Sequence, residues 1–244
     1  MKKFTFALTL ALGTAITAHA GGLMTNTNYH IAFDRMFARG ATTEIDAAYS
    51  NPAGLAWGHE GWQLSLNFQK PWQNRDIEAS VPGYLGTSFD KKYNGVASAP
   101  IVPALFASYK KDRLAISGMI GIVGSGGFVE YDEGIPMFEV PLRALLAQAG
   151  MMPNAYAYSA NMKGKQYIYG AQVNVAYKIN DYFSAAIGLR GNYYDGYNRG
   201  FVNASIPTGN IDLIDLRLDC IQRGFGVAPI VSVDYHNGPL TIAA

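Results

Sequence analysis

Several segments of the sequence alternate between apolar and polar side chains with a period of two residues. In residues 62–69, one set of alternate positions is Trp, Leu, Leu and Phe, and the other is Gln, Ser, Asn and Gln. This pattern predicts a β-strand with two different faces, because successive side chains of a strand point to opposite sides. One such strand would fit a soluble sandwich equally well. Further strands are expected at residues 102–109, 114–123, 167–177, 183–193 and 225–235, and a seventh begins at residue 240.

The connections between these segments favour a membrane barrel. Three are short and three are long, and the two kinds alternate along the chain. This asymmetry is typical of outer-membrane barrels, which have short periplasmic turns and longer external loops. We therefore predict an all-β, transmembrane β-barrel of the bacterial outer membrane rather than a soluble β-domain. The short turns are residues 110–113, 180–181 and 236–239, and the long connections are residues 70–101, 124–165 and 195–223.

Composition and the N-terminus agree with an exported protein. Charged residues make up 15% of the chain, compared with about 25% in soluble domains. Lys2 and Lys3 precede an apolar run and the triplet Ala18-His19-Ala20, which predicts a signal peptide cleaved after Ala20. A retained anchor is the alternative. No later stretch approaches the roughly 18 apolar residues of a membrane helix, and the net charge of +1 gives no case for nucleic acid.

These observations divide the chain into a signal peptide (1–20), a hatch or plug segment (21–60) and barrel strands (61–244). The hatch segment lacks alternation and fits only a barrel wider than eight strands. Six strands and part of a seventh leave an open edge, which lipid does not tolerate. We therefore expect the chain to be incomplete, with a small eight-stranded barrel as the alternative. Pro229 lies inside the sixth strand and predicts a bulge or break there.

The end of the hatch segment carries a recognisable pattern. It reads Ala38-Arg39-Gly40-Ala41, then the acidic residues Glu44 and Asp46, then Asn51-Pro52-Ala53-Gly54-Leu55 just before the first strand. In these residues the chain resembles the FadL family of outer-membrane transporters for long-chain fatty acids and other hydrophobic compounds. The resemblance implies a fourteen-stranded barrel, about half of it present here, with an N-terminal hatch. It also implies that ligand binds among external loops and passes to an inner pocket closed by the N-terminus. A shift of the hatch then opens a route to a kink in the third strand, where the ligand leaves sideways into the membrane.

The candidate site residues fall into four groups. Asn51, Pro52, Ala53 and Gly54 fit the hatch turn, although Asn-Pro also favours ordinary turns. Gly118 and Gly121 in the third strand are candidates for the sideways opening, or for tight packing against the plug. Arg190 is expected in the lumen, as is Lys178; either could attract a ligand carboxylate or pair with Asp34, Glu44 or Asp46. The ligand-binding candidates on a predicted external helix are Phe138, Leu142, Leu145, Leu146 and Met151.

That helix is expected over residues 138–150, with Pro141 in its first turn and Gly150 at its end. Leu142, Leu145 and Leu146 share one face, which could bind an apolar ligand or simply pack onto its own loop.

Chemistry-bearing motifs are lacking in the sequence. The four histidines have no metal-ligand spacing, Cys220 has no neighbouring His, and no cofactor or catalytic group is expected. We expect passive transport of a hydrophobic molecule such as a long-chain fatty acid by a monomer in contact with outer-membrane lipid. A general porin or structural barrel is the main alternative. A lipid-hydrolysing enzyme is disfavoured, because the only His outside the plug, His236, lies at a predicted turn.

Overall fold

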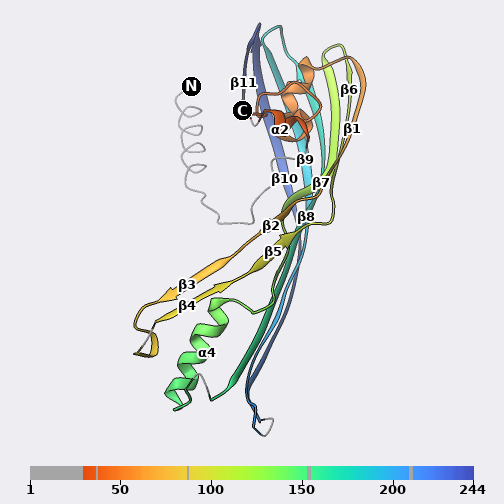
Figure 1. The fold of residues 1–244 in the computed structure, drawn as a ribbon. Helices are drawn as coiled ribbons and strands as arrows, with labels where there is room; N and C mark the ends of the chain where they lie inside the picture. The colour runs from red at the N-terminus through yellow and green to blue at the C-terminus, as the bar shows by residue number, and fades with distance from the viewer. Residues whose placement is uncertain (1–29, 37, 87, 153–154, 209–210) are drawn as a thin grey trace, which may run out of the picture.

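The computed structural model describes residues 30–36, 38–86, 88–152, 155–208 and 211–244, so the predicted signal peptide and the start of the hatch segment lie outside the described residues. A long, curved antiparallel sheet dominates the fold (Figure 1). Its main order is β1-β6-β7-β8-β9-β10-β11, with β2 and β5 joined beside β7, while β3 and β4 form a separate hairpin. The strands are β1 (Gly61–Gln69), β2 (Trp72–Asn74), β3 (Ile77–Val81), β4 (Phe89–Tyr93), β5 (Gly95–Ser98), β6 (Val102–Lys111), β7 (Leu114–Tyr131), β8 (Ala157–Lys178), β9 (Phe183–Ile206), β10 (Ile211–Asn237) and β11 (Leu240–Ala243).

All seven predicted strand segments are present, but β7, β8, β9 and β10 are longer than the alternation predicted. The long connection predicted at residues 195–223 was wrong. Those residues belong to β9 and β10, which pair from Phe183–Tyr235 to Ile206–Ile211. The two strands are joined by residues 207–210, so this connection is short.

The break predicted at Pro229 was also wrong. Pro229 pairs with Leu189 in continuous register, and the only register shift in this ladder lies between Asp212 and Ile214. On the other side of β10, pairing with β11 begins only at Asp234. No described strand lies beside Pro229 on that side, so the missing backbone N–H of proline costs no ladder hydrogen bond there.

The outward face of β8, β9 and β10 is built from rows of side chains that lie opposite one another. Tyr169, Tyr193 and Phe225 form one aromatic row. Phe183 and Tyr235 form another, with ring centroids 5.1 Å apart. Between the rows lie Val, Ile and Leu side chains that are 45% to 77% exposed: Val173, Val175, Ile187, Leu189, Val227, Val231 and Val233.

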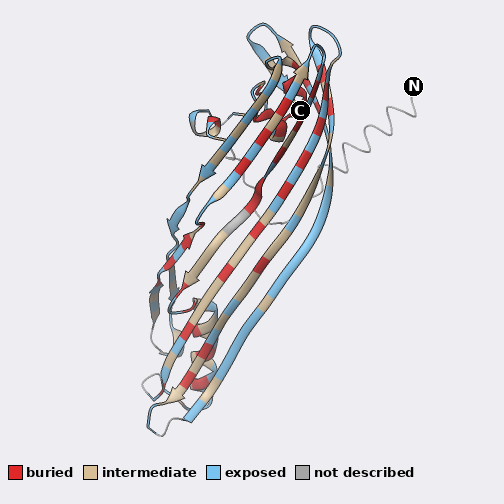
Figure 2. Ribbon diagram, turned by 90° about the vertical axis from the view of Figure 1, so that its right-hand side faces the viewer, coloured by how far each residue is buried: buried red, intermediate tan, exposed pale blue. Residues whose placement is uncertain are grey.

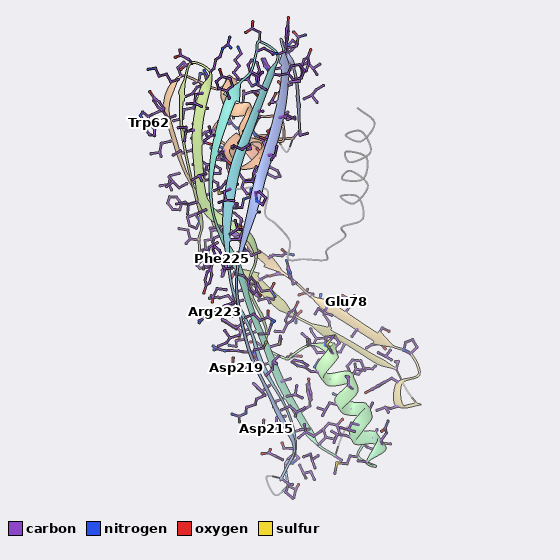
Figure 3. All side chains as sticks on the ribbon, turned by 180° about the vertical axis from the view of Figure 1, so that it is seen from behind. Trp62, Glu78, Asp215, Asp219, Arg223 and Phe225 are labelled. Carbon is purple, nitrogen blue, oxygen red and sulfur yellow. The ribbon has the colours of Figure 1, made fainter. Side chains whose placement is uncertain are left out.

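The spacing of these rows matches a membrane. About ten residue steps separate Phe225 from Tyr235, or about 33 Å of strand, which a tilt of about 40° reduces to about 25 Å. An apolar band of that height between aromatic girdles is the outer surface of a transmembrane barrel. Beyond Phe225 the face becomes charged: Asp195 lies 3.3 Å from Arg223, and Arg199 lies 2.9 Å from Asp219. Figure 3 shows this change along β10.

The hatch packs against the inner face of the wall, near the end where the tight turns lie (Figure 1). It contains α2 (Ala32–Arg35), α3 (Ala47–Ser50) and the 3-10 helix η1 (Pro52–Trp57). Its small apolar residues share one core with inward side chains of β6 to β9, and Figure 2 shows the buried positions alternating along these strands. The core includes Ala47, Ala48, Ala53, Leu55, Ala56, Ala104, Phe106, Met119, Ala176 and Ala186.

The other end of the sheet carries the β3–β4 hairpin, the short η2 (Tyr84–Gly86) and the helix α4 (Pro136–Gln148). The helix was predicted, but it begins earlier than expected, so Pro141 lies inside it. Gly150 follows its end with a φ of +80°, as a helix stop requires. No helix in the described ranges is long and apolar enough to cross a membrane.

Candidate functional site

The predicted hatch turn is buried and fixed to the wall by hydrogen bonds. Pro52 starts η1, where its fixed φ suits a first helical position. The backbone N–H of Ala53 donates to Ser232 Oγ at 3.0 Å, and Ser184 Oγ donates to the carbonyl of Ala53 at 2.8 Å. Ser184 also accepts from Trp57 Nε1 at 2.9 Å. Wall side chains therefore replace the water that this turn would otherwise need.

A second set of bonds holds α3. The side-chain amides of Gln172 and Asn174 both donate to the carbonyl of Ala48, at 2.8 and 2.9 Å. Both residues are on the inward face of β8 and are 2% exposed. The hatch is thus attached to β8, β9 and β10 through its backbone.

The predicted lumen cations contact the hatch through aromatic rings. The guanidinium of Arg190 lies 4.2 Å from the ring of Tyr49, and its Nε donates to Gln172. Lys178 Nζ lies 4.6 Å from the ring of Trp57. Among the described side chains neither pairs with Glu44 or Asp46; the side chain of Asp34 is outside the described set.

Those two hatch acids already have a partner within the hatch. Arg39 binds Asp46 at 2.6 Å and Glu44 at 2.7 Å. This internal ion pair explains why the acids do not reach Arg190: a bidentate guanidinium–carboxylate contact is geometrically specific and holds both groups.

Among the described residues, two of the buried polar side chains that lack a hydrogen-bond partner belong to the hatch and to the wall beside it. They are the amide of Asn51, 3% exposed, and the carboxyl of Asp234, 1% exposed. Asp234 approaches the hatch next to Gly54, since a Cβ placed on Gly54 would lie 3.4 Å from Asp234 Oδ2.

We expect Ser184→Ala to loosen the hatch without unfolding the barrel. The change removes a donor from the Ala53 carbonyl and an acceptor from the Trp57 indole, which should cost about 2 kcal/mol. Hydrogen exchange of residues 51–57 should rise. Ser159→Ala, at an exposed position of β8, is the matched control and should leave that exchange unchanged. Equal protection in both variants would contradict the anchoring role of Ser184.

Among the described strands, the ladder of the wall is interrupted between β5 and β6. The ladder between β6 and β7 ends at Ala104–Gly121, and the ladder between β5 and β7 resumes at Ser98–Phe128. Between these pairs, β7 also shifts register against β8 at two points, between Ile122 and Gly124 and between Ser125 and Gly127. We call residues 99–103 and 122–127 the wall break.

The two glycines predicted to mark an opening lie beside the wall break. Gly121 and Ala104 form the last pair of the β6–β7 ladder before the break. A Cβ on Gly121 would lie 3.3 Å from the carbonyl oxygen of Pro103. Gly118 lies within the regular ladder, opposite Ala107 and Val173. The irregular residues come after both glycines, so the role of Gly118 and Gly121 in an opening stays a prediction.

The external helix α4 buries part of the face that was predicted to bind a ligand. Leu142 and Leu146 are 6% and 5% exposed and pack with Tyr156, Ala160, Val202 and Ala204, and Phe138 and Met151 are partly buried against this cluster. Leu145 is exposed (57%), and so are Met137 (76%) and Met152 (65%). Ligand binding by this helix stays a prediction, and Leu145 is its exposed member.

A buried carboxylate ties α4 to the β4 strand. Glu139 is fully buried and accepts hydrogen bonds from Lys91 Nζ at 2.9 Å, Tyr93 Oη at 2.8 Å and Arg143 Nε at 2.8 Å. Burial alone would raise the pKa of Glu139, but the hydrogen bonds from Lys91, Tyr93 and Arg143 outweigh it and hold the pKa below its usual value. Burial and the Glu139 carboxylate raise the pKa of Tyr93.

Several of these residues carry no sequence signal that distinguishes them. Ser184 and Ser232 look like ordinary inward positions of an alternating strand. Tyr167, which pairs with Ser125 of the wall break, looks like an ordinary outward position. Their roles depend on which distant segments pack against them. In the part of the chain described, no cluster of His, Cys, Asp or Glu is arranged to hold a metal ion.

Comparison with known proteins gives a match among solved structures. No family model matches the sequence, and no curated protein matches it. Among solved structures, a crystal structure of a Pseudomonas aeruginosa FadL homologue matches with a TM-score of 0.62 and 15% sequence identity. The match covers 91% of this chain and 52% of the homologue, so the chain spans about half the length of that protein. The fold is therefore that of a FadL-like barrel.

Proposed function

We propose that the protein carries hydrophobic molecules, with long-chain fatty acids as the model class, across the bacterial outer membrane. The molecule would bind at the external end, enter the barrel and, after a movement of the hatch away from the wall, leave sideways into the bilayer. No chemical step is involved.

The observation that carries this proposal is the combination of a hatch bonded to the inner face of the wall with a wall break that begins at the aromatic row, where Ile122 pairs with Tyr169. A water-filled pore is a poor route for an apolar solute, and the hatch obstructs one. An interruption of the ladder at the edge of the apolar band would give an apolar solute a route from the lumen to the lipid that it prefers. Irregular backbone near the membrane is tolerated where it packs against protein or lines a cavity.

The external end offers a first contact. Leu145, Met137 and Met152 expose apolar surface on and beside α4. Met side chains adapt to ligands of different shape, which suits a surface that must accept several apolar molecules. Glu139 and its three donors keep the helix in position.

The test is uptake of labelled oleate by cells that lack their own transporter for hydrophobic compounds and express the full-length protein. We expect uptake above the empty-vector level, together with little swelling of sugar-loaded liposomes that contain the purified protein. Rapid sugar permeation without oleate uptake would favour a general porin and contradict the proposal.

A further inference from the structure

Tyr167 is buried although it lies on the outward face of the wall. By alternation along β8 it shares this face with Tyr169 and Val173, which are 44% and 65% exposed, whereas Tyr167 is 8% exposed. The neighbouring strand shows the same contrast: on the outward face of β7, Ile120 is 62% exposed and Ile122 only 5%. Something in the protein therefore covers the outward face at this point.

The covering residues belong to the wall break. Tyr167 and Ile122 form one hydrophobic cluster with Ala99, and Val102 packs against it. Ala99 and Val102 lie in and beside the segment that links β5 to β6, where the ladder with β7 is interrupted. The ring of Tyr167 thus fills the outer side of the break.

On the inner side of the break, Val123 packs against β8. A Cβ on Gly170 would lie 2.5 Å from Val123 Cγ1, so the Val123 side chain packs directly on the backbone of β8. Val123 is 4% exposed and belongs to the core shared with the hatch. Two adjacent residues of β7 thus belong to different clusters: Ile122 to the outward cluster with Tyr167, and Val123 to the core shared with the hatch.

The Tyr167 side chain can move without opening the sheet. The backbone of Tyr167 pairs with Asp195 in the unbroken ladder of β8 and β9. Opening the wall between two regular strands would expose ladder groups to lipid at a cost of several kcal/mol each. Rotation of one side chain between staggered rotamers breaks no ladder bond.

We propose that Tyr167 is the side chain that closes the sideways exit and limits the size of the molecule that leaves through it. This inference rests on the proposed function. The ring turns away from Ala99 and Ile122 as an apolar chain arrives from the inner side, and it returns when the chain has entered the bilayer. Regular strands of the wall are not involved.

The test compares three variants of the full-length protein in the oleate uptake assay, with a bulky branched-chain fatty acid as a second substrate. For Tyr167→Ala we expect uptake of oleate to rise about threefold and that of the branched acid about tenfold, because the wider ligand depends more on the space vacated. Tyr167→Trp should slow both. Tyr177→Ala, at a 49% exposed site on the same face of β8 but away from the wall break, is the matched control and should match the wild type.

Heat-modifiable electrophoretic mobility identifies folded protein, and only folded variants are compared. If Tyr167→Ala does not fold, Tyr167→Leu and Tyr167→Trp replace it: uptake of both acids should rise in Tyr167→Leu and fall in Tyr167→Trp. Wild-type uptake with an unchanged ratio of the two acids in every Tyr167 variant overturns the inference and leaves the proposed function standing. No wild-type uptake of either acid overturns both.

Discussion

Gly54→Ala is expected to unseat the hatch. A Cβ at Gly54 would lie 2.2 Å from the backbone carbonyl oxygen of Thr42, a separation at which one of the two backbone segments must move. Because neither atom belongs to a flexible side chain, we expect a cost of about 3 kcal/mol to the seated hatch. Unseating should remove the obstruction from the lumen, and the variant should swell sugar-loaded liposomes faster than the wild type.

Gly40→Ala is the matched control for this prediction. It makes the same chemical change in the same segment, but a Cβ at Gly40 has no heavy atom within 4 Å. We expect its stability to change by no more than about 0.5 kcal/mol. Liposomes with Gly40→Ala should swell at the wild-type rate. If Gly54→Ala also swells at that rate, the hatch either tolerates the clash or does not obstruct the lumen.

Glu139→Ala is expected to release the external helix from the β3–β4 hairpin. The change removes the carboxylate to which Lys91, Tyr93 and Arg143 all donate. It leaves the two cations, Lys91 and Arg143, without the negative charge that they share. Removing one partner of a buried ion pair costs about 3–5 kcal/mol. Limited proteolysis should cut residues 133–152 much faster than in the wild type, while the barrel remains folded. Glu133→Ala, which removes a largely exposed acid 3.2 Å from Lys91, should have little effect.

The same carboxylate gives the helix a dependence on pH. The pKa of Glu139 is below its usual value in the folded protein, so its stabilising contribution is fully present above the unfolded pKa of about 4.5. It is lost as the pH falls through the lower, folded value. Protection of α4 from proteolysis should therefore stay constant from about pH 7 to pH 5 and fall at more acid pH. If α4 is as well protected from proteolysis below pH 4 as it is at pH 7, this role of the Glu139 ion pair is contradicted.

Prediction from the sequence succeeded where the two faces of a strand meet different surroundings. In residues 225–235 one face meets lipid and the other meets the hatch, so the side chains must alternate. In residues 195–223 the outward face carries charges, and Asp195, Arg199 and Arg223 pair with oppositely charged neighbours across the strands. The inward face packs on α4 at Val202 and Ala204, which is too short a stretch to show as a strand-length alternation. These long extensions of β9 and β10 therefore read as loops.

The site was predicted in part for a related reason. The hatch turn has a local signature in Asn51 and Pro52, and its place against the wall follows from the strand that comes after it. The wall break depends on pairing between segments far apart in the chain, Ala99 with Ile122 and Tyr167. Nothing in the local sequence around Tyr167 distinguishes it from the exposed Tyr169.

A reversible disulfide between hatch and wall tests the transport mechanism most directly. Ala53→Cys with Ser232→Cys replaces the contact in which the Ala53 N–H donates to Ser232 Oγ at 3.0 Å, and Cys220→Ser removes the native thiol. We predict that the oxidised protein takes up oleate at the empty-vector level and that a reductant restores uptake. Oleate uptake at the wild-type rate with the hatch locked to the wall would contradict the account.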